Sequence, residues 1–297
     1  MDNTTDTQNR GQGRAVIVIS SHVARGSVGN RAAVFTLEAL GFPVWAVPTV
    51  ILPWHPGHGP ATRIVPDATQ FARFINDLER APWLNEVSAI LTGYLGGPEQ
   101  TAAIAGLVQT LKARNPRARY VCDPVLGDKG GLYVPEATAA AIRDRLLPLA
   151  DITTPNRYEL AWLTGTDIDG TETAIRAARR APPVEVMVTS APASSDDRLA
   201  NLLVGETGVL RAAHDSIPKA PNGTGDLTAA LYLARLLAGE TREEALAKTT
   251  GSVVAILNKA IERGSDELML ETDRQILTRP QATIEIERVS DPLAVSP

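Results

Sequence analysis

Short apolar runs alternate with longer amphipathic segments through most of this chain. Runs rich in valine, isoleucine and other apolar residues predict buried strands. These runs are residues 15–20, 43–49, 88–92, 120–123, 151–154 and 184–190. Between them, apolar residues recur about every three or four positions, which is the spacing of one helix face. These segments are residues 30–40, 67–80, 98–114, 136–147, 157–163 and 172–180.

Several predicted helices carry boundary residues at their ends. The helix over residues 30–40 is closed by Gly41, and the helix over residues 98–114 begins at a proline and stops before Pro116. Residues 67–80 place four large side chains on one face, which predicts that this face is buried. These side chains are Phe71, Phe74, Ile75 and Leu78.

The last third of the chain departs from strict alternation. Residues 199–204 and 208–212 predict a hairpin that turns at Gly205. Residues 226–237 and 242–262 then predict two helices in succession. This part of the chain is therefore expected to be mainly helical after the hairpin.

Strands that alternate with helices predict an α/β fold in three layers, with a mostly parallel sheet covered by helices on both faces. Ligands of such sheets bind outside the carboxyl ends of the strands, so motifs that follow a strand are the candidates for chemistry. No internal repeat, low-complexity tract or linker interrupts the pattern. We therefore expect residues 14–290 to form one domain, preceded by a disordered leader at residues 1–13 and followed by a tail at residues 291–297.

Composition narrows the class of protein. Apolar residues make up 44% of the 297 residues and charged residues 21%, which provides enough apolar material for a sizeable core. The net charge is -5 and no block of lysine and arginine stands out, so nucleic acids and acidic membrane surfaces are poor candidates for partners. The single cysteine, Cys122, has no partner for an intrachain disulfide, and the polar N-terminus lacks the apolar stretch of a signal peptide. With no run long enough to span a membrane, these features predict a cytoplasmic protein.

The strongest local motif is N-G-T-G-D at residues 222–226, where the predicted helix over residues 226–237 begins. Glycines let the backbone turn tightly, and the free N–H groups at a helix N-terminus bind anions such as phosphate. A carboxylate in the same turn can accept the proton of an incoming hydroxyl group. On local features alone, however, Asp226 is more simply explained as a helix cap.

Two further polar motifs follow predicted strands. In D-P-V-L-G-D at residues 123–128, the two acids can hold Mg²⁺, directly or through water, or can simply form a turn, and the motif alone favours neither interpretation. In T-P-N-R-Y-E at residues 154–159, Asn156 and Glu159 have the spacing of a capping box. The same two side chains can also lie beside a metal ion and phosphates, because a capped helix end is already polar.

The turn over residues 20–30 is rich in glycine but lacks the G-x-G-x-x-G spacing of a dinucleotide site, and G-x-x-x-x-G-K-[ST] does not occur in the chain. The Ser21 hydroxyl in this turn is a candidate for binding a polar substrate. Tyr94, after the third strand, offers an aromatic face for stacking or for packing. His55 and His58 lie in a proline- and glycine-rich loop without a nearby cysteine, so a zinc site is not expected there.

Taken in order, these motifs resemble those of the ribokinase-like superfamily, and within it the pyridoxal kinases, which phosphorylate vitamin B6. The similar runs are S-H-V-x-x-G-x-x-G-N at residues 21–30, G-Y-L-G at 93–96, C-D-P-V-L-G-D at 122–128 and T-P-N-x-x-E at 154–159. The G-T-G-D run at 223–226 is common to the wider superfamily. The resemblance extends from about residue 14 to about residue 280. It implies a ribokinase-like fold and transfer of phosphate from ATP to the 5′-hydroxymethyl group of pyridoxal or a related B6 vitamer.

The resemblance also implies roles for individual residues. Asp226 is expected to be the catalytic base, and the amides of Gly223, Thr224 and Gly225 the anion hole. The residues implied for ATP are Asp123, Thr154, Asn156, Glu159 and Thr189, and those implied for Mg²⁺ are Asp123, Asp128 and Glu159. The residues implied for the vitamer are Ser21, His55, Pro56, Gly57, Tyr94, Tyr133 and Asp226. Members of the family are commonly homodimers, use Mg²⁺ and often respond to K⁺, so the same is expected here.

The chain departs from the family pattern close to the expected substrate. Trp54-His55-Pro56-Gly57 stands where the family often has an N-H-T-type run, and Asn222 stands where a small or apolar residue is usual. Residues 128–134 form a short segment, which implies a reduced flap over ATP. Two alternatives therefore stay open: a kinase that acts on a hydroxymethylpyrimidine, and a protein that binds a B6 vitamer on a kinase fold without phosphorylating it.

Overall fold

A nine-stranded sheet organises the molecule. The computed structural model describes residues 14–193, 198–218, 220–280 and 284–293, so the predicted leader and the last four residues of the predicted tail lie outside the described residues. The strand order is β11-β10-β9-β8-β7-β4-β3-β1-β2. The six strands from β2 to β8 pair in parallel, and β9, β10 and β11 extend the sheet antiparallel. The prediction of a mostly parallel sheet is confirmed.

The strands match the apolar runs closely, with boundaries that shift by a few residues. The main-sheet strands are β1 Ala15–Val23, β2 Val44–Leu52, β3 Val87–Thr92, β4 Arg119–Cys122, β7 Ile152–Thr153, β8 Glu185–Pro192, β9 Arg198–Gly205, β10 Gly208–Asp215 and β11 Ile286–Val289. A separate small hairpin consists of β5 Gly127–Asp128 and β6 Gly131–Leu132. The predicted hairpin across Gly205 is present as β9 and β10.

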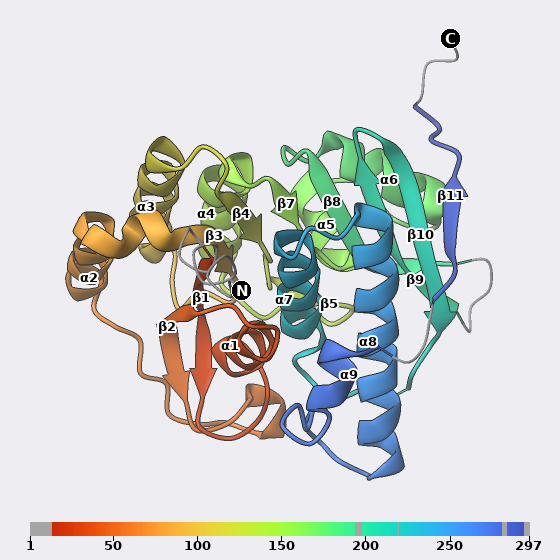
Figure 1. Cartoon of the computed structure of the whole chain (residues 1–297), viewed down its shortest axis with the longest axis horizontal. Helices are drawn as coiled ribbons and strands as arrows, with labels where there is room; N and C mark the ends of the chain where they lie inside the picture. Colours follow the sequence, from red (N-terminus) through yellow and green to blue (C-terminus); the bar gives the residue numbers. More distant parts are fainter. Residues whose placement is uncertain (1–13, 194–197, 219, 281–283, 294–297) are drawn as a thin grey trace, which may run out of the picture.

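Helices cover both faces of the sheet (Figure 1). One face packs against α1 Asn30–Ala39, α7 Thr224–Leu237 and α8 Arg242–Glu262, with the short α9 Arg274–Thr278 beside them. The other face packs against α2 Ala68–Arg80, α3 Gln100–Arg114, α4 Glu136–Ala141, α5 Arg157–Thr164 and α6 Thr171–Arg180. The three-layer α/β architecture is therefore the one that the alternation predicts.

The central strand β1 shows why its sequence is apolar at every position. Ile17 and Ile19 enter the core beneath α2, α3 and α4, whereas Val16 and Val18 enter the core beneath α1 and α7. All four side chains are at most 1% exposed. Because successive side chains of a strand point to opposite faces, a strand covered on both faces needs apolar residues throughout. Each such side chain contributes about 1.5–3 kcal/mol by burial.

Three details of the predicted elements are wrong. Phe74 is 49% exposed, because α2 packs on the core mainly through Phe71 and Ile75. The regular helix predicted over residues 136–147 ends at Ala141 and continues as a π turn and a 3-10 turn, since Pro148 has no N–H to extend the helical ladder. The sequence pattern also gave no indication of β11.

The first residue of the predicted tail, Asp291, is bonded to α6. β11 pairs with β10, and directly after it the Asp291 carboxylate accepts hydrogen bonds from the Arg179 guanidinium at 2.6 and 3.0 Å. The Asp291 side chain is mostly buried, at 12% exposed. Asp291 is therefore attached to α6, and the boundary at residue 290 stays a prediction.

Candidate active site

Asp226 lies in the first turn of α7, and it does not cap that helix. The N-cap residue is Gly223, with a φ of 94°, and no side chain caps the helix end. A Cβ atom at Gly223 would also collide with the carbonyl oxygen of Ser27. Only glycine satisfies both the positive φ and the close approach. The helix N-terminus is thus left with uncapped amides at residues 224 and 225, where Gly225 is exposed.

The Asp226 carboxylate is held between two glycine turns. The Gly29 backbone N–H lies near it, and a Cβ atom at Gly93 would lie 3.6 Å from its Oδ1. Burial raises the pKa of Asp226 to about 6, against the smaller lowering effect of the Gly29 N–H. A carboxylate with a pKa close to neutrality is suited to accept a proton at physiological pH.

A second carboxylate, Asp123, lies across from this turn. Asp123 follows β4 and is 5% exposed, and its Oδ1 accepts a hydrogen bond of 2.9 Å from the Thr154 hydroxyl. Its Oδ2 faces the helix mouth, 3.8 Å from the position of a Cβ atom at Gly225. Burial raises the pKa of Asp123 well above its usual value, and the neighbouring charges of Glu159 and Asp226 raise it further. Negative charge is therefore unfavourable here unless a positive charge balances it, so the site favours binding of a cation.

Glu159 holds the backbone around this cluster. Its Oε1 accepts hydrogen bonds from the amides of Leu126 at 2.7 Å and Gly127 at 3.4 Å, and its Oε2 accepts one from Asn156 at 2.8 Å. Asn156 in return caps α5 and donates to the Gly127 carbonyl at 2.8 Å. Burial raises the pKa of Glu159 to about 7, although these three hydrogen bonds lower it. The predicted capping box is confirmed, and the same residues fasten the 123–128 loop to α5.

Of the remaining predicted ATP residues, Thr154 directly follows β7 and Thr189 lies within β8. Thr154 is 3% exposed, and the Thr189 amide donates to the Pro155 carbonyl at 2.9 Å. Thr189 also forms a parallel bridge with Asn156. Ser190 directly after it has a φ of 52°, at the irregularity in the pairing of β8 with β9. The structure thus brings Asp123, Thr154, Asn156, Glu159 and Thr189 to one edge of the sheet.

The predicted metal residues do not form a protein-only cage. Within residues 14–193, 198–218, 220–280 and 284–293, no group of three His, Cys, Asp or Glu side chains has the geometry to hold a metal ion. Asp128 is exposed, and its Oδ1 accepts a hydrogen bond from the Gly130 amide, which is turn chemistry. Both oxygens of Glu159 already accept backbone hydrogen bonds. Asp123 is the carboxylate that fits Mg²⁺, which usually takes one or two protein carboxylates and completes its shell with water and phosphate oxygens.

The residues predicted for the vitamer approach the Asp226 turn from the other side. Ser21 is 7% exposed and lies at the register shift of β1, directly against Gly29. The Tyr94 amide donates to the Ser20 hydroxyl at 3.1 Å, and the Tyr94 carbonyl accepts from the Thr49 hydroxyl at 2.7 Å. The backbone of Tyr94 is therefore held on both sides.

Residues 53–60, which we call the vitamer loop, connect the end of β2 to this region. The loop contains a short 3-10 turn, Pro56–His58. At its start, Nδ1 of His55 accepts a hydrogen bond from the Gly57 amide at 3.0 Å. A Cβ atom at Gly57 would lie 3.2 Å from Nδ2 of Asn222, the residue before the α7 N-cap. Burial, together with the charge of His58, lowers the pKa of His55. The His58 ring bonds to the Glu267 carboxylate at 3.0 Å.

Tyr133 follows the β5–β6 hairpin and is 52% exposed. Its pKa is raised by partial burial and then by four acids, Glu159, Asp128, Asp123 and Asp226. The phenol therefore lies within electrostatic range of these four acids. The predicted short flap is the hairpin itself, and its first strand begins at Gly127, where Asn156 and Glu159 bind.

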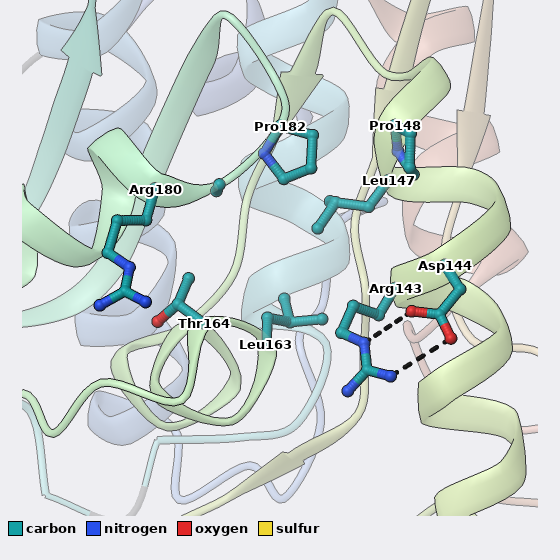
Figure 2. Close-up of a pocket in the computed structure, with 9 residues that line it drawn as sticks. Arg143, Asp144, Leu147, Pro148, Leu163, Thr164, Arg180 and Pro182 are labelled. Atoms are coloured by element: carbon teal, nitrogen blue, oxygen red, sulfur yellow. Dashed lines mark hydrogen bonds and ion pairs between the residues drawn. The ribbon is translucent and has the colours of Figure 1, made fainter.

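A cavity of about 430 Å³ lies elsewhere, and it contains none of the predicted site residues. It opens between the chain segments that lead into β7 and β8, so it belongs to the amino ends of these strands. Figure 2 shows Arg143 paired with Asp144 on one side, and Arg180 near Thr164 on the other. Because ligands of open parallel sheets bind at the carboxyl ends, this cavity is not the candidate active site.

The sequence motifs did not identify four residues that shape the site. Ser20 and Gly93 lie against each other near Asp226, the Gly29 amide lowers the pKa of that carboxylate, and Glu267 binds the vitamer loop. Gly29 and Gly93 lie within the predicted motifs, and their glycine identity was the available signal. Glu267 lies beyond α8 with no motif around it, so nothing in the sequence pointed to it.

Comparison with known proteins gives the family. A profile of the phosphomethylpyrimidine kinase family matches residues 70–270. A pyridoxal kinase of Rubrobacter xylanophilus is 36% identical over 95% of this chain and 100% of its own length, and one of Corynebacterium diphtheriae is 35% identical over 93% and 99%. The solved structure of the Leishmania donovani pyridoxal kinase with ADP and pyridoxine superimposes with a TM-score of 0.86 at 28% identity, over 93% of this chain and 99% of that one. The chain belongs to the phosphomethylpyrimidine kinase family, with the ribokinase-like fold, and within it to the pyridoxal kinases.

Proposed function

We propose that this chain transfers the γ-phosphoryl group of ATP to the 5′-hydroxymethyl group of pyridoxal, or of a related B6 vitamer, and so forms pyridoxal 5′-phosphate. The observation that carries the proposal is the position of the Asp226 carboxylate, with a pKa of about 6, at the N-terminus of α7, where no side chain caps the backbone amides. A pyridoxal kinase with this fold has been solved in complex with ADP and pyridoxine. That complex supports ATP as the phosphate donor and a B6 vitamer as the acceptor.

In the proposed reaction, the 5′-oxygen attacks the γ-phosphorus in line, and the bond between that phosphorus and the bridging oxygen of ADP breaks. Asp226 accepts the proton of the attacking hydroxyl group. The amides of Gly223, Thr224 and Gly225 bind the phosphoryl oxygens, over which charge is spread in the transition state. The left-handed Gly223 sets the direction of these amides before the substrate arrives.

Asp123, supported by Thr154, is the residue that would hold Mg²⁺. When bound, the ion neutralises phosphate charge and orients the triphosphate. Asn156 and Glu159 would act on the nucleotide through the shape of the 123–128 loop, to which they make three backbone contacts. The K⁺ response expected from the family stays a prediction.

For the vitamer, the proposed pocket is formed by Ser21, Tyr94 and the vitamer loop, with Tyr133 at the opening. Pro56 offers no hydroxyl group where the family often has one, so ring recognition depends more on the neighbouring His55 and on Ser21. A site that holds a substrate by few polar contacts discriminates less strongly between similar substrates. We therefore expect activity with more than one B6 vitamer.

The proposal is tested by incubating the protein with Mg²⁺-ATP and a panel of acceptors, with mass detection of each product. The panel contains pyridoxal, pyridoxine, pyridoxamine, a hydroxymethylpyrimidine and ribose. We expect a phosphate ester from pyridoxal at the highest kcat/KM. Phosphorylation of the pyrimidine alone would favour the second candidate, to which the matching family profile gives specific support. Tight pyridoxal binding without product would favour a binding protein.

Two further properties belong to this proposal. A homodimer and a cytoplasmic location are both expected from the family and from the sequence composition, and sedimentation and fractionation would test them. In the described part of the chain, no helix combines the length and the apolar character that crossing a bilayer requires.

A further inference from the structure

We infer that Glu267 is a positioning residue for the vitamer site, although it follows α8 and is far in sequence from every motif. It fastens the vitamer loop and the turn after β1 to each other. This inference rests on the proposed kinase function and adds to it a specific determinant of vitamer binding. Figure 1 shows the setting: the chain after α8 turns back toward the loop after β2 at the lower edge of the molecule.

The first contact joins Glu267 to the vitamer loop. His58 Nε2 lies 3.0 Å from Glu267 Oε1, and the His58 side chain is only 24% exposed. Glu267 itself is 7% exposed, so water competes little for this hydrogen bond. The neighbouring Asp266 carboxylate is 58% exposed and lies 3.7 Å from the other ring nitrogen, beyond hydrogen-bond distance.

The second contact joins Glu267 to the turn after β1. The Arg25 guanidinium donates to the same Oε1 at 3.2 Å, and a Cβ atom at Gly26 would lie 2.5 Å from it. Gly26 has a φ of 104°, so its conformation and the lack of a side chain both suit a carboxylate packed on the backbone. The Ser265 hydroxyl donates to the Glu267 carbonyl at 2.8 Å and accepts from its amide at 3.2 Å, which fixes the backbone of this residue.

Both segments that Glu267 fastens reach the catalytic turn at their other ends. The vitamer loop meets Asn222 at Gly57, and the turn after β1 meets Gly223 at the Ser27 carbonyl. Two residues further along, Gly29 lies near Asp226, whose pKa its amide lowers. The nucleotide residues have no such connection, because their contacts run between the 123–128 loop, α5 and β8. Loss of Glu267 should therefore weaken vitamer binding and leave ATP binding unchanged.

The test compares Glu267→Ala with Asp266→Ala in the full-length protein. The control removes the adjacent carboxylate, which also pairs with Arg25, at 2.8 Å, and lies 3.7 Å from the His58 ring without a hydrogen bond to it. We expect KM for pyridoxal to rise about tenfold in Glu267→Ala, the scale of losing one buried charge-assisted hydrogen bond. We expect KM for ATP to stay within about twofold, and Asp266→Ala to leave both constants within about twofold, as is usual for exposed pairs.

Two further variants separate this role from a general loss of structure. Glu267→Gln keeps an acceptor for His58 and should recover most of the vitamer affinity, while His58→Ala should reproduce the rise in KM without touching Glu267. Combined with Glu267→Ala, His58→Ala should add little, because the two side chains act as one unit. Amide hydrogen exchange over residues 54–60 should be faster in Glu267→Ala and His58→Ala than in Asp266→Ala, and this readout needs no activity.

Distinct outcomes overturn the inference and the proposed function. If the wild-type protein phosphorylates no B6 vitamer, the proposed function is wrong, whatever the exchange data show. If the wild-type protein is active and Glu267→Ala and His58→Ala leave KM for pyridoxal unchanged, or raise both KM values equally, Glu267 has no positioning role. Equal exchange over residues 54–60 in Glu267→Ala and Asp266→Ala would contradict it as well.

Discussion

The two sides of the Asp226 turn are built in different ways. On the nucleotide side, Asp123 directly follows β4, and Asn156 and Glu159 lie at the start of α5, just after β7. Asn156 and Glu159 bond to each other and to the backbone of the 123–128 loop. On the vitamer side, the contacts join segments that are far apart in sequence, such as His58 with Glu267 and Gly57 with Asn222. The nucleotide side is thus a local construction on the sheet edge, whereas the vitamer side depends on tertiary contacts.

This difference has a functional consequence. ATP is common to all reactions of such kinases, and a compact set of loops fixed by short hydrogen bonds suits a constant ligand. The acceptor varies between relatives, and a loop attached by a few distant side chains can change without disturbing the sheet edge. The departures at Trp54–Gly57 and at Asn222 both fall on the vitamer side. The following predictions test whether the two sides are separable.

The largest effect is expected where the two sides meet. Asp226→Asn removes the base but keeps the shape of the side chain, so kcat should fall about 10²- to 10⁴-fold. Glu172→Gln is a matched control, because Glu172 is also an acid in a first helical turn, far from the site. Steady-state assays with both substrates saturating measure the change, and a circular dichroism spectrum confirms the fold. Turnover near that of the wild type in a folded Asp226→Asn protein would contradict the assignment.

The pH dependence should follow the same carboxylate. Burial raises the pKa of Asp226 to about 6, and the base works only when it is ionised. Below pH 6, kcat/KM for pyridoxal should therefore fall about tenfold per pH unit, and above pH 6 it should level off. A profile that is flat between pH 5 and 7 would show that another group is the base.

A smaller effect is expected from Glu159→Gln on the nucleotide side. Both carboxylate oxygens of Glu159 accept hydrogen bonds from backbone N–H groups. The glutamine NH₂ group cannot accept one, so at least one of these N–H groups would lose its partner. The free energy of unfolding should therefore fall by about 1–3 kcal/mol. KM for ATP should rise several-fold, with KM for pyridoxal unchanged. Glu244→Gln in the exposed capping box of α8 is the control and should change stability by less than about 1 kcal/mol. Denaturant unfolding and initial rates measure both quantities; an equal rise in both KM values would contradict the separation of the two sides.

The smallest effect is expected from Asn222→Ala on the vitamer side. Asn222 is exposed and contacts the vitamer loop at Gly57, and one exposed polar contact contributes little to stability. KM for pyridoxal should rise no more than about threefold, and KM for ATP should not change. Initial rates at varied pyridoxal and saturating ATP measure KM for pyridoxal. An increase beyond tenfold would mean that Asn222 contacts the vitamer itself.

Much of the fold followed from the sequence because the sheet is buried on both faces. Continuous apolar strands such as β1 and helices with clear end residues, such as α5 and α8, leave few alternatives. β11 escaped prediction because residues 286–289 include two exposed charged residues at the edge of the sheet. Phe74 was placed in the core by helical spacing alone, which does not tell whether a second layer covers that face.

The candidate site was predictable only where its contacts are local. The capping box of Asn156 and Glu159 is visible in six residues of sequence, and the structure shows it in the predicted place. Spacing could not decide between a cap and a base for Asp226, because that depends on the positive φ of Gly223. Asp128 resembles a metal ligand in the sequence, yet it forms a turn. Glu267 contacts His58 only because α8 packs against the sheet, and no local sequence pattern predicts such a contact.

The central claim is that the Asp226 carboxylate is the group that accepts the substrate proton. The most direct test records kcat/KM for pyridoxal against pH for the wild-type protein and for Asp226→Asn in one series of buffers. We predict an inflection near pH 6 in the wild type and a low rate without that inflection in the variant. An inflection near pH 6 that persists in Asp226→Asn would assign the titrating group to another residue and contradict the account.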